Sequence, residues 1–293
     1  MAKLAEQLER KAFSAAIDVA LRRINKDREK GLLEIVDLTE KFMGDNFTKE
    51  AYEGARAMIK NPDHKWMRYV NRLLDETDPH VAKMTALNLG YQAAFYGTKT
   101  IRKMREVHDC NIPWLILMDP TSACNLHCTG CWAAEYGHKL NLTFEELDSI
   151  VTQGKELGIY FYMMTGGEPL VRKADVIKLC EKHNDVAFHC YTNGTLVDQA
   201  FCDEMKRVGN LSLSISLEGF EDTNDFRRGD GVYAKVLHAM DLLHENGLLF
   251  GNSVCYTRKN MDAVTSDEFF DLLIEHGSRF AWYFHLMPVG MDA

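Results

Sequence analysis

Three cysteines lie within eight residues of one another, in the segment DPTSACNLHCTGCWAAEYG. They are Cys124, Cys128 and Cys131, so their spacing is C-x3-C-x2-C. Cysteine thiolates are the usual protein ligands of iron–sulfur clusters, and a [4Fe–4S] cluster normally takes four ligands. Three clustered cysteines without an obvious fourth therefore predict a cluster with one open iron, which can bind a cofactor or a substrate directly.

A zinc site is the alternative interpretation of these cysteines, with His127 or His138 as a further ligand. Structural zinc takes four ligands, usually as two pairs. The spacing offers no second pair, so it favours iron–sulfur over zinc. The other cysteines are scattered, and we expect them to be reduced, buried thiols. They are Cys110, Cys180, Cys190, Cys202 and Cys255.

The cysteine segment, which directly follows a β-rich segment at 114–119, resembles the radical S-adenosylmethionine (radical SAM) superfamily. The resemblance covers roughly residues 112–288. It implies that the three cysteines hold a [4Fe–4S] cluster and that the methionyl amine and carboxylate of S-adenosylmethionine chelate the fourth iron. One departure is Gly130, because the family usually has an aromatic residue just before the third cysteine, whereas here Trp132 follows it.

A second motif, Gly166-Gly167-Glu168-Pro169, follows the next β-rich segment. Two glycines let a backbone approach a ligand closely and adopt a positive φ. The same motif in the family binds the methionine amino group, and Glu168 could accept a hydrogen bond from the ammonium or orient it. An ordinary Gly-Gly turn before a helix is the alternative.

Further cofactor contacts are implied at the ends of later strands. Asn193 lies in a Thr-Asn-Gly turn that in the family borders the ribose and carboxylate. Serines alternate with apolar residues in SLSISLEG, and a period of two places them on one face, which would line a polar barrel interior. Family members often have S-x-D-G here, where this chain has Glu218, so the resemblance implies Ser214, Ser216 and Glu218 as candidate contacts to the ribose or carboxylate, with a half-exposed strand as the alternative. Arg228 is the candidate partner of the methionyl carboxylate, with a solvated basic loop as the alternative.

From residue 114 onward, short β-rich runs alternate with amphipathic helical runs. The strands are predicted at 114–119, 159–164, 186–191, 211–217, 248–256 and 279–287. The helices are predicted at 143–157, 172–182, 196–208, 231–246 and 266–276. Thr143 and Glu146 form a capping-box pattern at the first of these helices. Such alternation predicts parallel strands with right-handed crossovers, hence an α/β fold with a partial (β/α)6 TIM-like barrel.

The active site of such a barrel lies at the C-terminal ends of its strands, where all of the motifs above fall. Residues 1–108 are predicted to be an all-helical N-terminal region, and residues 109–293 the radical SAM core. One helix of the N-terminal region is expected from Pro79, capped by Asp78, to about Met104.

Composition narrows the class of protein further. The 293-residue chain has a net charge of −9, which argues against a nucleic-acid footprint. The sequence contains no apolar run near the ~20 residues of a membrane span and no signal peptide, so a cytoplasmic location is expected. The chain stops just past the sixth strand, so the cysteine-rich (SPASM-type) extension of many relatives is expected to be absent, in a minimal core or a truncated chain.

The resemblance implies a radical SAM enzyme. A flavodoxin or ferredoxin would supply one electron, and reductive cleavage of S-adenosylmethionine would give a 5′-deoxyadenosyl radical that takes a hydrogen atom from a substrate. That substrate does not follow from the residues. The alternative is an iron–sulfur electron-transfer protein or a zinc-binding protein that never cleaves the cofactor.

Overall fold

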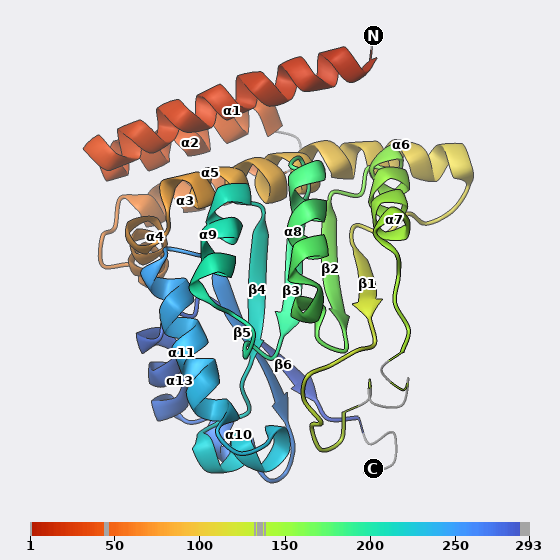
Figure 1. Ribbon diagram of the computed structural model, residues 1–293. Coiled ribbons are helices and arrows are strands. Elements are labelled where there is room, and N and C mark those ends of the chain that lie inside the picture. Colours follow the sequence, from red (N-terminus) through yellow and green to blue (C-terminus); the bar gives the residue numbers. More distant parts are fainter. Residues whose placement is uncertain (1, 44–46, 132, 134–136, 138, 288–293) are drawn as a thin grey trace.

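Six parallel strands form one curved sheet in the computed structural model, which describes residues 2–43, 47–131, 133, 137 and 139–287 (Figure 1). Each strand pairs with the next in chain order, from β1 to β6. They are β1 (Ile116–Thr121), β2 (Phe161–Gly166), β3 (Ala187–Thr192), β4 (Leu211–Ser216), β5 (Phe250–Tyr256) and β6 (Ala281–His285). Among the described residues β6 does not pair with β1, so the barrel is partial and open, as the sequence predicted.

Helices join the strands and cover the outer face of the sheet (Figure 1). The principal ones are α7 (Phe144–Glu156), α8 (Lys173–Lys182), α9 (Gln199–Val208), α11 (Val232–Glu245) and α13 (Asp267–Glu275). Three short elements accompany them: η4 (Pro169–Arg172), α10 (Glu221–Arg228) and α12 (Met261–Val264). The capping box of α7 is confirmed, because Thr143 Oγ1 accepts from the Glu146 amide at 3.2 Å and Glu146 Oε2 accepts from the Thr143 amide at 2.7 Å.

The main core lies between the sheet and these helices. Tyr162, Phe188, Leu213 and Phe250, one on each of the strands β2 to β5, are at most 1% exposed. Since side chains alternate along a strand, the neighbours of these residues point to the concave face of the sheet. Burial of the outer face therefore fixes which side chains line the barrel interior.

The N-terminal region is helical, as predicted. It comprises α1 (Ala2–Lys26), α2 (Arg28–Met43), α3 (Lys49–Ile59), α4 (Lys65–Glu76), α5 (Pro79–Thr85), η2 (Ala86–Gly97) and α6 (Thr98–His108). The run α5–η2–α6 crosses the N-terminal ends of the strands, and α1 and α2 lie over it (Figure 1). None of the helices in the described ranges is long and apolar enough to cross a bilayer.

The helix predicted to start at Pro79 begins there, because Asp78 Oδ1 accepts hydrogen bonds from the amides of His80 and Val81. Its interior differs from the prediction of a plain helix to about Met104. Residues Ala86–Gly97 are π-helical, and α6 continues from them to His108. π-Helix, with its i→i+5 hydrogen bonds, is rare and frequently occurs at functional sites.

Candidate functional site

The loops that carry the sequence motifs meet at the C-terminal ends of the strands, at the lower edge of the sheet in Figure 1. The cysteine loop follows β1 and returns to its starting point. Thr121 Oγ1 donates to Asn141 Oδ1 at 2.6 Å, and the amide of Leu142 donates to the carbonyl of Pro120 at 3.1 Å. The loop is therefore closed at its base, next to the end of β1.

The loop after β2 packs directly on the cysteine loop. The amide of Gly167 donates to the carbonyl of Thr121 at 2.9 Å, and the amide of Glu168 donates to the carbonyl of Ala123 at 2.8 Å. A Cβ atom at residue 167 would lie 2.2 Å from the Ala123 carbonyl oxygen, and one at Gly166, whose φ is +107°, would lie 2.6 Å from that of Thr121. Both glycines are required because two backbones touch here.

The carboxylate of Glu168 is 1% exposed and accepts three hydrogen bonds. Its Oε1 accepts from Thr192 Oγ1 at 2.6 Å and from the Leu170 amide at 2.9 Å, and its Oε2 accepts from the Asn193 amide at 2.7 Å. Burial raises the pKa of Glu168, while these donors oppose the rise. Glu168 thus ties the loop after β2 to the loop after β3, and Pro169 next to it opens the short helix η4.

Asn193 connects the third loop to the cysteine loop. Its Nδ2 donates to Asn125 Oδ1 at 2.9 Å, and its Oδ1 accepts from the Thr195 amide at 2.9 Å. Asn125 in turn donates from Nδ2 to Thr195 Oγ1 at 2.9 Å. Because Asn125 directly follows Cys124, the position of that cysteine depends on the loop after β3.

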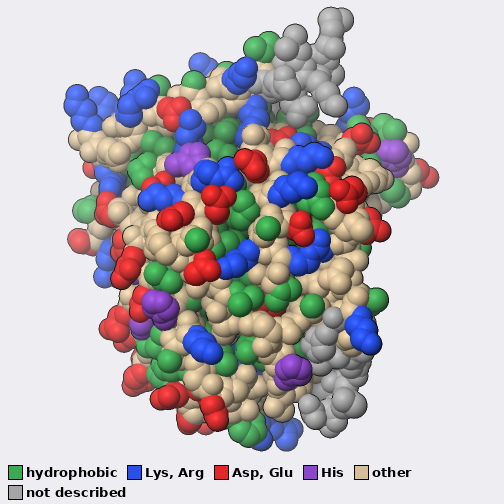
Figure 2. Space-filling view, viewed as in Figure 1, with side chains coloured by type: hydrophobic (Ala, Val, Ile, Leu, Met, Phe, Trp, Pro, Cys, Tyr) green, Lys and Arg blue, Asp and Glu red, His purple; other side chains and the backbone are tan. Residues whose placement is uncertain are grey.

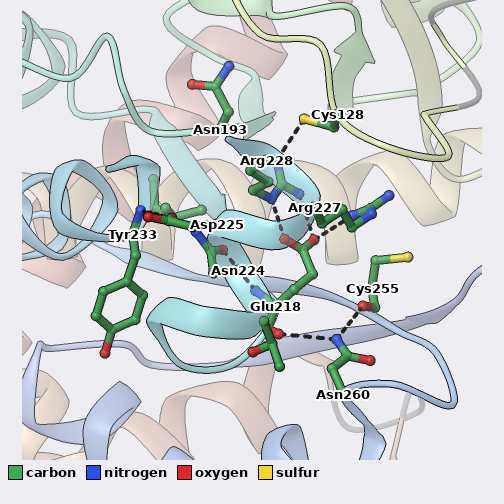
Figure 3. A network of polar contacts seen from close by, with 12 residues as sticks. Cys128, Asn193, Glu218, Asn224, Asp225, Arg227, Arg228, Tyr233, Cys255 and Asn260 are labelled. Carbon is green, nitrogen blue, oxygen red and sulfur yellow. Dashed lines mark hydrogen bonds and ion pairs between the residues drawn. The ribbon is translucent and has the colours of Figure 1, made fainter. Parts of the chain in front are cut away.

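A buried ion-pair cluster lies on the other side of the cysteine loop (Figure 3). The side chain of Glu218 is 1% exposed and receives Arg227 Nη1 at 2.7 Å and Arg228 Nη2 at 2.6 Å, with Arg228 Nε on its other oxygen. Burial raises the pKa of Glu218, but the two arginines outweigh it and hold that pKa below its usual value. Two guanidinium groups and one carboxylate leave a net positive charge here.

That charge faces the cysteine loop. Arg228 Nη1 lies 3.9 Å from Cys128 Sγ, so a guanidinium group adjoins the middle thiol of the three-cysteine motif (Figure 3). The backbones of Arg227 and Thr129 also bond, from the Thr129 amide to the Arg227 carbonyl at 2.8 Å. Burial raises the pKa of the Cys128 thiol, and Arg228 and Arg227 oppose that rise. Arg228 is the last residue of the helix α10, and most of its donors point to Glu218. The alternative of a solvated basic loop is therefore wrong for this side chain.

The serines of β4 line the concave face as their alternation predicted. Ser214 is fully buried, and its Oγ lies 2.8 Å from His189 Nε2, while Ser212 Oγ lies 2.8 Å from His189 Nδ1. Ser216 is half-buried at the end of the strand. Burial lowers the pKa of His189 to about 4, so the imidazole is neutral at pH 7. His189 was not predicted as a site residue, because its pairing with Ser212 depends on the strand register that the structure shows.

The three clustered cysteines suit an iron–sulfur cluster by their chemistry. Each is a free, half-buried thiol, and a cationic side chain adjoins the middle one. Among the described residues, no three Cys, His, Asp or Glu side chains are grouped closely enough to hold a single metal ion. His138, a ligand in the zinc alternative, lies outside the described residues, as does Trp132.

A partial parallel barrel with a three-cysteine loop at the C-terminal ends of its strands defines a class of α/β enzymes that bind an iron–sulfur cofactor. The chain belongs to the radical SAM superfamily, whose family model matches residues 118–273. This superfamily uses a [4Fe–4S] cluster and S-adenosylmethionine. No substrate follows from membership.

Curated relatives match about three-fifths of the chain. The chain is 27% identical over 186 residues to an AdoMet-dependent heme synthase of Methanosarcina barkeri, covering 61% of this chain and 52% of that protein. It is 32% identical over 183 residues to a GTP 3′,8-cyclase of Alkaliphilus oremlandii, covering 58% and 55% respectively. The chain thus spans about half the length of these relatives.

Solved structures support the fold. Streptococcus suis SuiB bound to S-adenosylmethionine superposes with a TM-score of 0.57 at 19% identity, over 82% of this chain and 54% of SuiB. The enzyme anSMEcpe with bound AdoMet and a peptide gives a TM-score of 0.51 at 21% identity, over 59% and 50%. At this identity the likeness concerns the fold alone.

Proposed function

We propose that this chain is a radical SAM enzyme whose cluster is held by Cys124, Cys128 and Cys131. When bound, such a cluster would pass one electron from an external donor to S-adenosylmethionine, whose cleavage would give methionine and a 5′-deoxyadenosyl radical able to take a hydrogen atom from an organic substrate. The observation that carries the proposal is the joining of three loops: the Gly166-Gly167-Glu168 loop and the Asn193 loop are both hydrogen-bonded to the cysteine loop. A redox or zinc module has no need of such an arrangement.

Arg228 has a defined task in this proposal. Its guanidinium, fixed on Glu218, places positive charge 3.9 Å from Cys128 Sγ. Positive charge favours the thiolate form that binds iron, and hydrogen bonds and charges near the sulfurs set the potential of a cluster. The prediction that Arg228 binds the methionyl carboxylate requires guanidinium donors other than the two bound to Glu218, and it stays a prediction.

The remaining cofactor contacts are proposed from the same geometry. Gly166, Gly167, Glu168 and Pro169 lie against the cysteine loop, and they would border the cluster where the methionine amino group would bind. Asn193 borders the same loop from β3. Ser214, Ser216 and Glu218 were predicted to touch the ribose or carboxylate; of these, Ser216 at the end of β4 is the half-buried one, whereas Ser214 and Glu218 bond to protein groups.

The two regions of the chain have different proposed roles. Residues 109–293 would form the catalytic core and residues 1–108 a helical region at the opposite end of the strands. An external electron donor is required by radical SAM chemistry, and we propose a flavodoxin or a ferredoxin in that role.

Anaerobic reconstitution tests the proposal. The full chain, loaded with iron and sulfide, is expected to bind about four irons, and dithionite with S-adenosylmethionine is then expected to release 5′-deoxyadenosine. Cys128→Ala should abolish both results, since the cluster loses one of three protein ligands. The matched control is Cys110→Ala. Cys110 was expected to be buried, but it is an exposed free thiol outside the cysteine loop, so its loss should change neither result.

Two results would contradict the proposal. A tightly held tetrahedral zinc in place of iron would favour the zinc alternative. A [4Fe–4S] cluster that yields no deoxyadenosine with any reductant would favour an electron-transfer protein.

A further inference from the structure

An apolar pocket of about 580 Å³ lies between the α1–α2 layer and the helices beneath it. Its volume falls within the ~300–1,000 Å³ of ordinary small-molecule sites. Leu249, the residue before β5, also lines the pocket, which places it at the N-terminal ends of the strands. The cysteine loop is at the opposite ends (Figure 1). The pocket is therefore separate from the radical SAM site.

The pocket is built by small side chains on one helix face. Ala82, Ala86, Gly90 and Ala94 recur every four residues along α5 and η2, and all line the pocket. Gly90 is exposed, and a Cβ atom added there would have no neighbour within 4 Å, so the pocket is open above that residue. The π-helical run Ala86–Gly97 carries three of the four.

The shape of the pocket is elongated. On α1 its lining extends from Phe13 to Ile24, and at 1.5 Å per helical residue this is about 16 Å. On the facing run of α5 and η2 the lining extends from Ala82 to Ala94. An extended chain fits such a space better than a compact ring system does.

The chemistry of the lining selects the occupant. Among the described residues no charged side chain lines the pocket, and its hydroxyl groups belong to Thr39, Thr77, Thr85 and Tyr91. Thr39 Oγ1 already donates to the carbonyl of Ile35 at 2.8 Å. A peptide segment would bury backbone amides and carbonyls that find too few hydrogen-bond partners in the pocket, which costs free energy. Burial of a charged cofactor would cost more.

The charged groups near the pocket are engaged with one another. Lys83 pairs with Asp18 at 2.7 Å, and Arg28 pairs with Asp75 at 2.5 Å. Acidic and basic side chains are interspersed over the face in Figure 2, apart from Lys and Arg gathered at the end of the α1–α2 hairpin. Contact between an apolar lining and water is unfavourable, so a filled pocket is favoured.

We propose that this pocket binds an aliphatic chain, such as the acyl or isoprenoid chain of a lipid or of a free amphiphile. The chain lies between α1 and the α5–η2 helix, remote from the cysteine loop. It binds by burial of methylene groups alone. Binding therefore requires neither the cluster nor S-adenosylmethionine.

Thermal unfolding of the delipidated full chain tests the proposal, with dodecanol as the probe and dodecanediol as its chemical control. Dodecanol is expected to raise the melting temperature in a concentration-dependent way. Dodecanediol, which has the same length but would bury a second hydroxyl, is expected to raise it much less.

Variants make the test specific. Gly90→Leu fills the space above residue 90, so it should abolish the dodecanol-induced shift while leaving the ligand-free protein folded. Gly54→Leu is the matched control, because Gly54 is an exposed helical glycine of α3 whose added Cβ also meets nothing within 4 Å; it should retain the shift. If Gly90→Leu does not fold, Ala94→Leu replaces it, because the larger side chain at residue 94 fills the pocket from the same helix face.

Flotation with phosphatidylcholine vesicles distinguishes the sources of the chain. Flotation that Gly90→Leu abolishes indicates a membrane lipid, whereas a dodecanol shift without flotation indicates a free amphiphile. The proposal is overturned if dodecanol leaves the melting temperature unchanged, or if a folded Gly90→Leu or Ala94→Leu variant keeps the full shift.

Discussion

At the scale of single residues, the buried carboxylate of Glu218 decides the electrostatics of the site. It is 1% exposed and is the shared partner of Arg227 and Arg228, which are 16% and 10% exposed. A buried charge without its partner is costly, since desolvation is no longer offset by attraction. Glu218 therefore holds two arginines in place, one of which faces Cys128.

Glu218→Gln should destabilise the chain strongly. The substitution keeps the shape but removes the negative charge, so two partly buried guanidinium groups face each other without compensation. We expect the free energy of unfolding to fall by about 3–5 kcal/mol, measured by urea denaturation of the cluster-free chain. Glu204→Gln is the control, because Glu204 forms an exposed pair with Arg207 and its loss should cost less than about 1 kcal/mol. Equal effects of the two variants would disprove the role given to Glu218.

The residue types at the site could be predicted from the sequence, but their pairing could not. Cysteine spacing and the Gly-Gly-Glu-Pro motif are local patterns, so they are visible in one stretch of chain. The bonds from Glu168 to Thr192 and Asn193 join residues 24 and 25 positions apart, and those from His189 to Ser212 and Ser214 join residues 23 and 25 apart. Such contacts depend on strand register, which periodicity alone does not fix.

At the scale of elements, the site depends on how closely the loop after β2 approaches the loop after β1. The two backbones bond through the amides of Gly167 and Glu168. Around residue 167 the nearest backbone atoms belong to Ser122 and Ala123 of the cysteine loop. No side chain fits between them.

Gly167→Ala should separate these loops. The added Cβ would meet the Ala123 carbonyl oxygen at 2.2 Å and the Ser122 carbonyl oxygen at 2.6 Å, which are backbone atoms that cannot turn away. We expect deoxyadenosine formation to fall at least about tenfold, on the grounds that small misplacements of reacting groups cost about that much or more. The assay uses the anaerobically reconstituted protein, with iron content measured in parallel.

The control for this substitution is Gly54→Ala, in a helical position with open space around it, where activity should be unchanged. A Gly167→Ala protein with normal iron content and normal turnover would show that the loops do not need this contact.

The elements themselves were largely predictable. Each of the six strands lies within two residues of its predicted bounds, and the capping box of α7 is confirmed. Hydrophobic runs and caps are local signals, so they survive in the sequence. The π-helical run Ala86–Gly97 and the helix α10 were missed because their backbone form depends on what packs against them.

At the scale of the whole molecule, the helical region is fastened to the sheet by buried polar contacts. Asn88 is fully buried, and its Nδ2 donates to the carbonyls of Asn184 and Val186 at 3.0 and 3.3 Å. On the other side, the Asp78 amide donates to the carbonyl of Gly247 at 2.9 Å. The change of hydrophobic pattern along the chain predicted two regions, but it could not indicate how tightly they are joined.

Glu76 is the main ionic contact between these regions. Its carboxylate, at the end of α4, binds Arg279 before β6 and His244 of α11, as well as Arg72 on its own helix. Burial raises the pKa of Glu76, but these partners outweigh it and lower that pKa to about 2. A carboxyl group with a lowered pKa stabilises the folded state above its unfolded pKa, and this stabilisation is lost as the pH falls through the folded value.

Glu76→Gln should therefore reduce stability at neutral pH and lose part of that effect in acid. We expect the wild-type advantage in unfolding free energy to shrink by about 1–2 kcal/mol between pH 6 and pH 3, since the group is partly exposed and the full linkage effect is screened. Urea denaturation of both proteins at the two pH values gives this double difference. Glu53→Gln, at an exposed pair with Lys49, should show no such change. Because Glu76 joins α4 to α11 and Arg279 before β6, the loss of stability should appear in a single unfolding transition of the helical region and the sheet.

Two results would show that the two regions are not coupled through this carboxylate. One is a wild-type advantage in unfolding free energy that is the same at pH 3 as at pH 6, and the other is a wild-type protein whose helical region and sheet unfold in separate transitions.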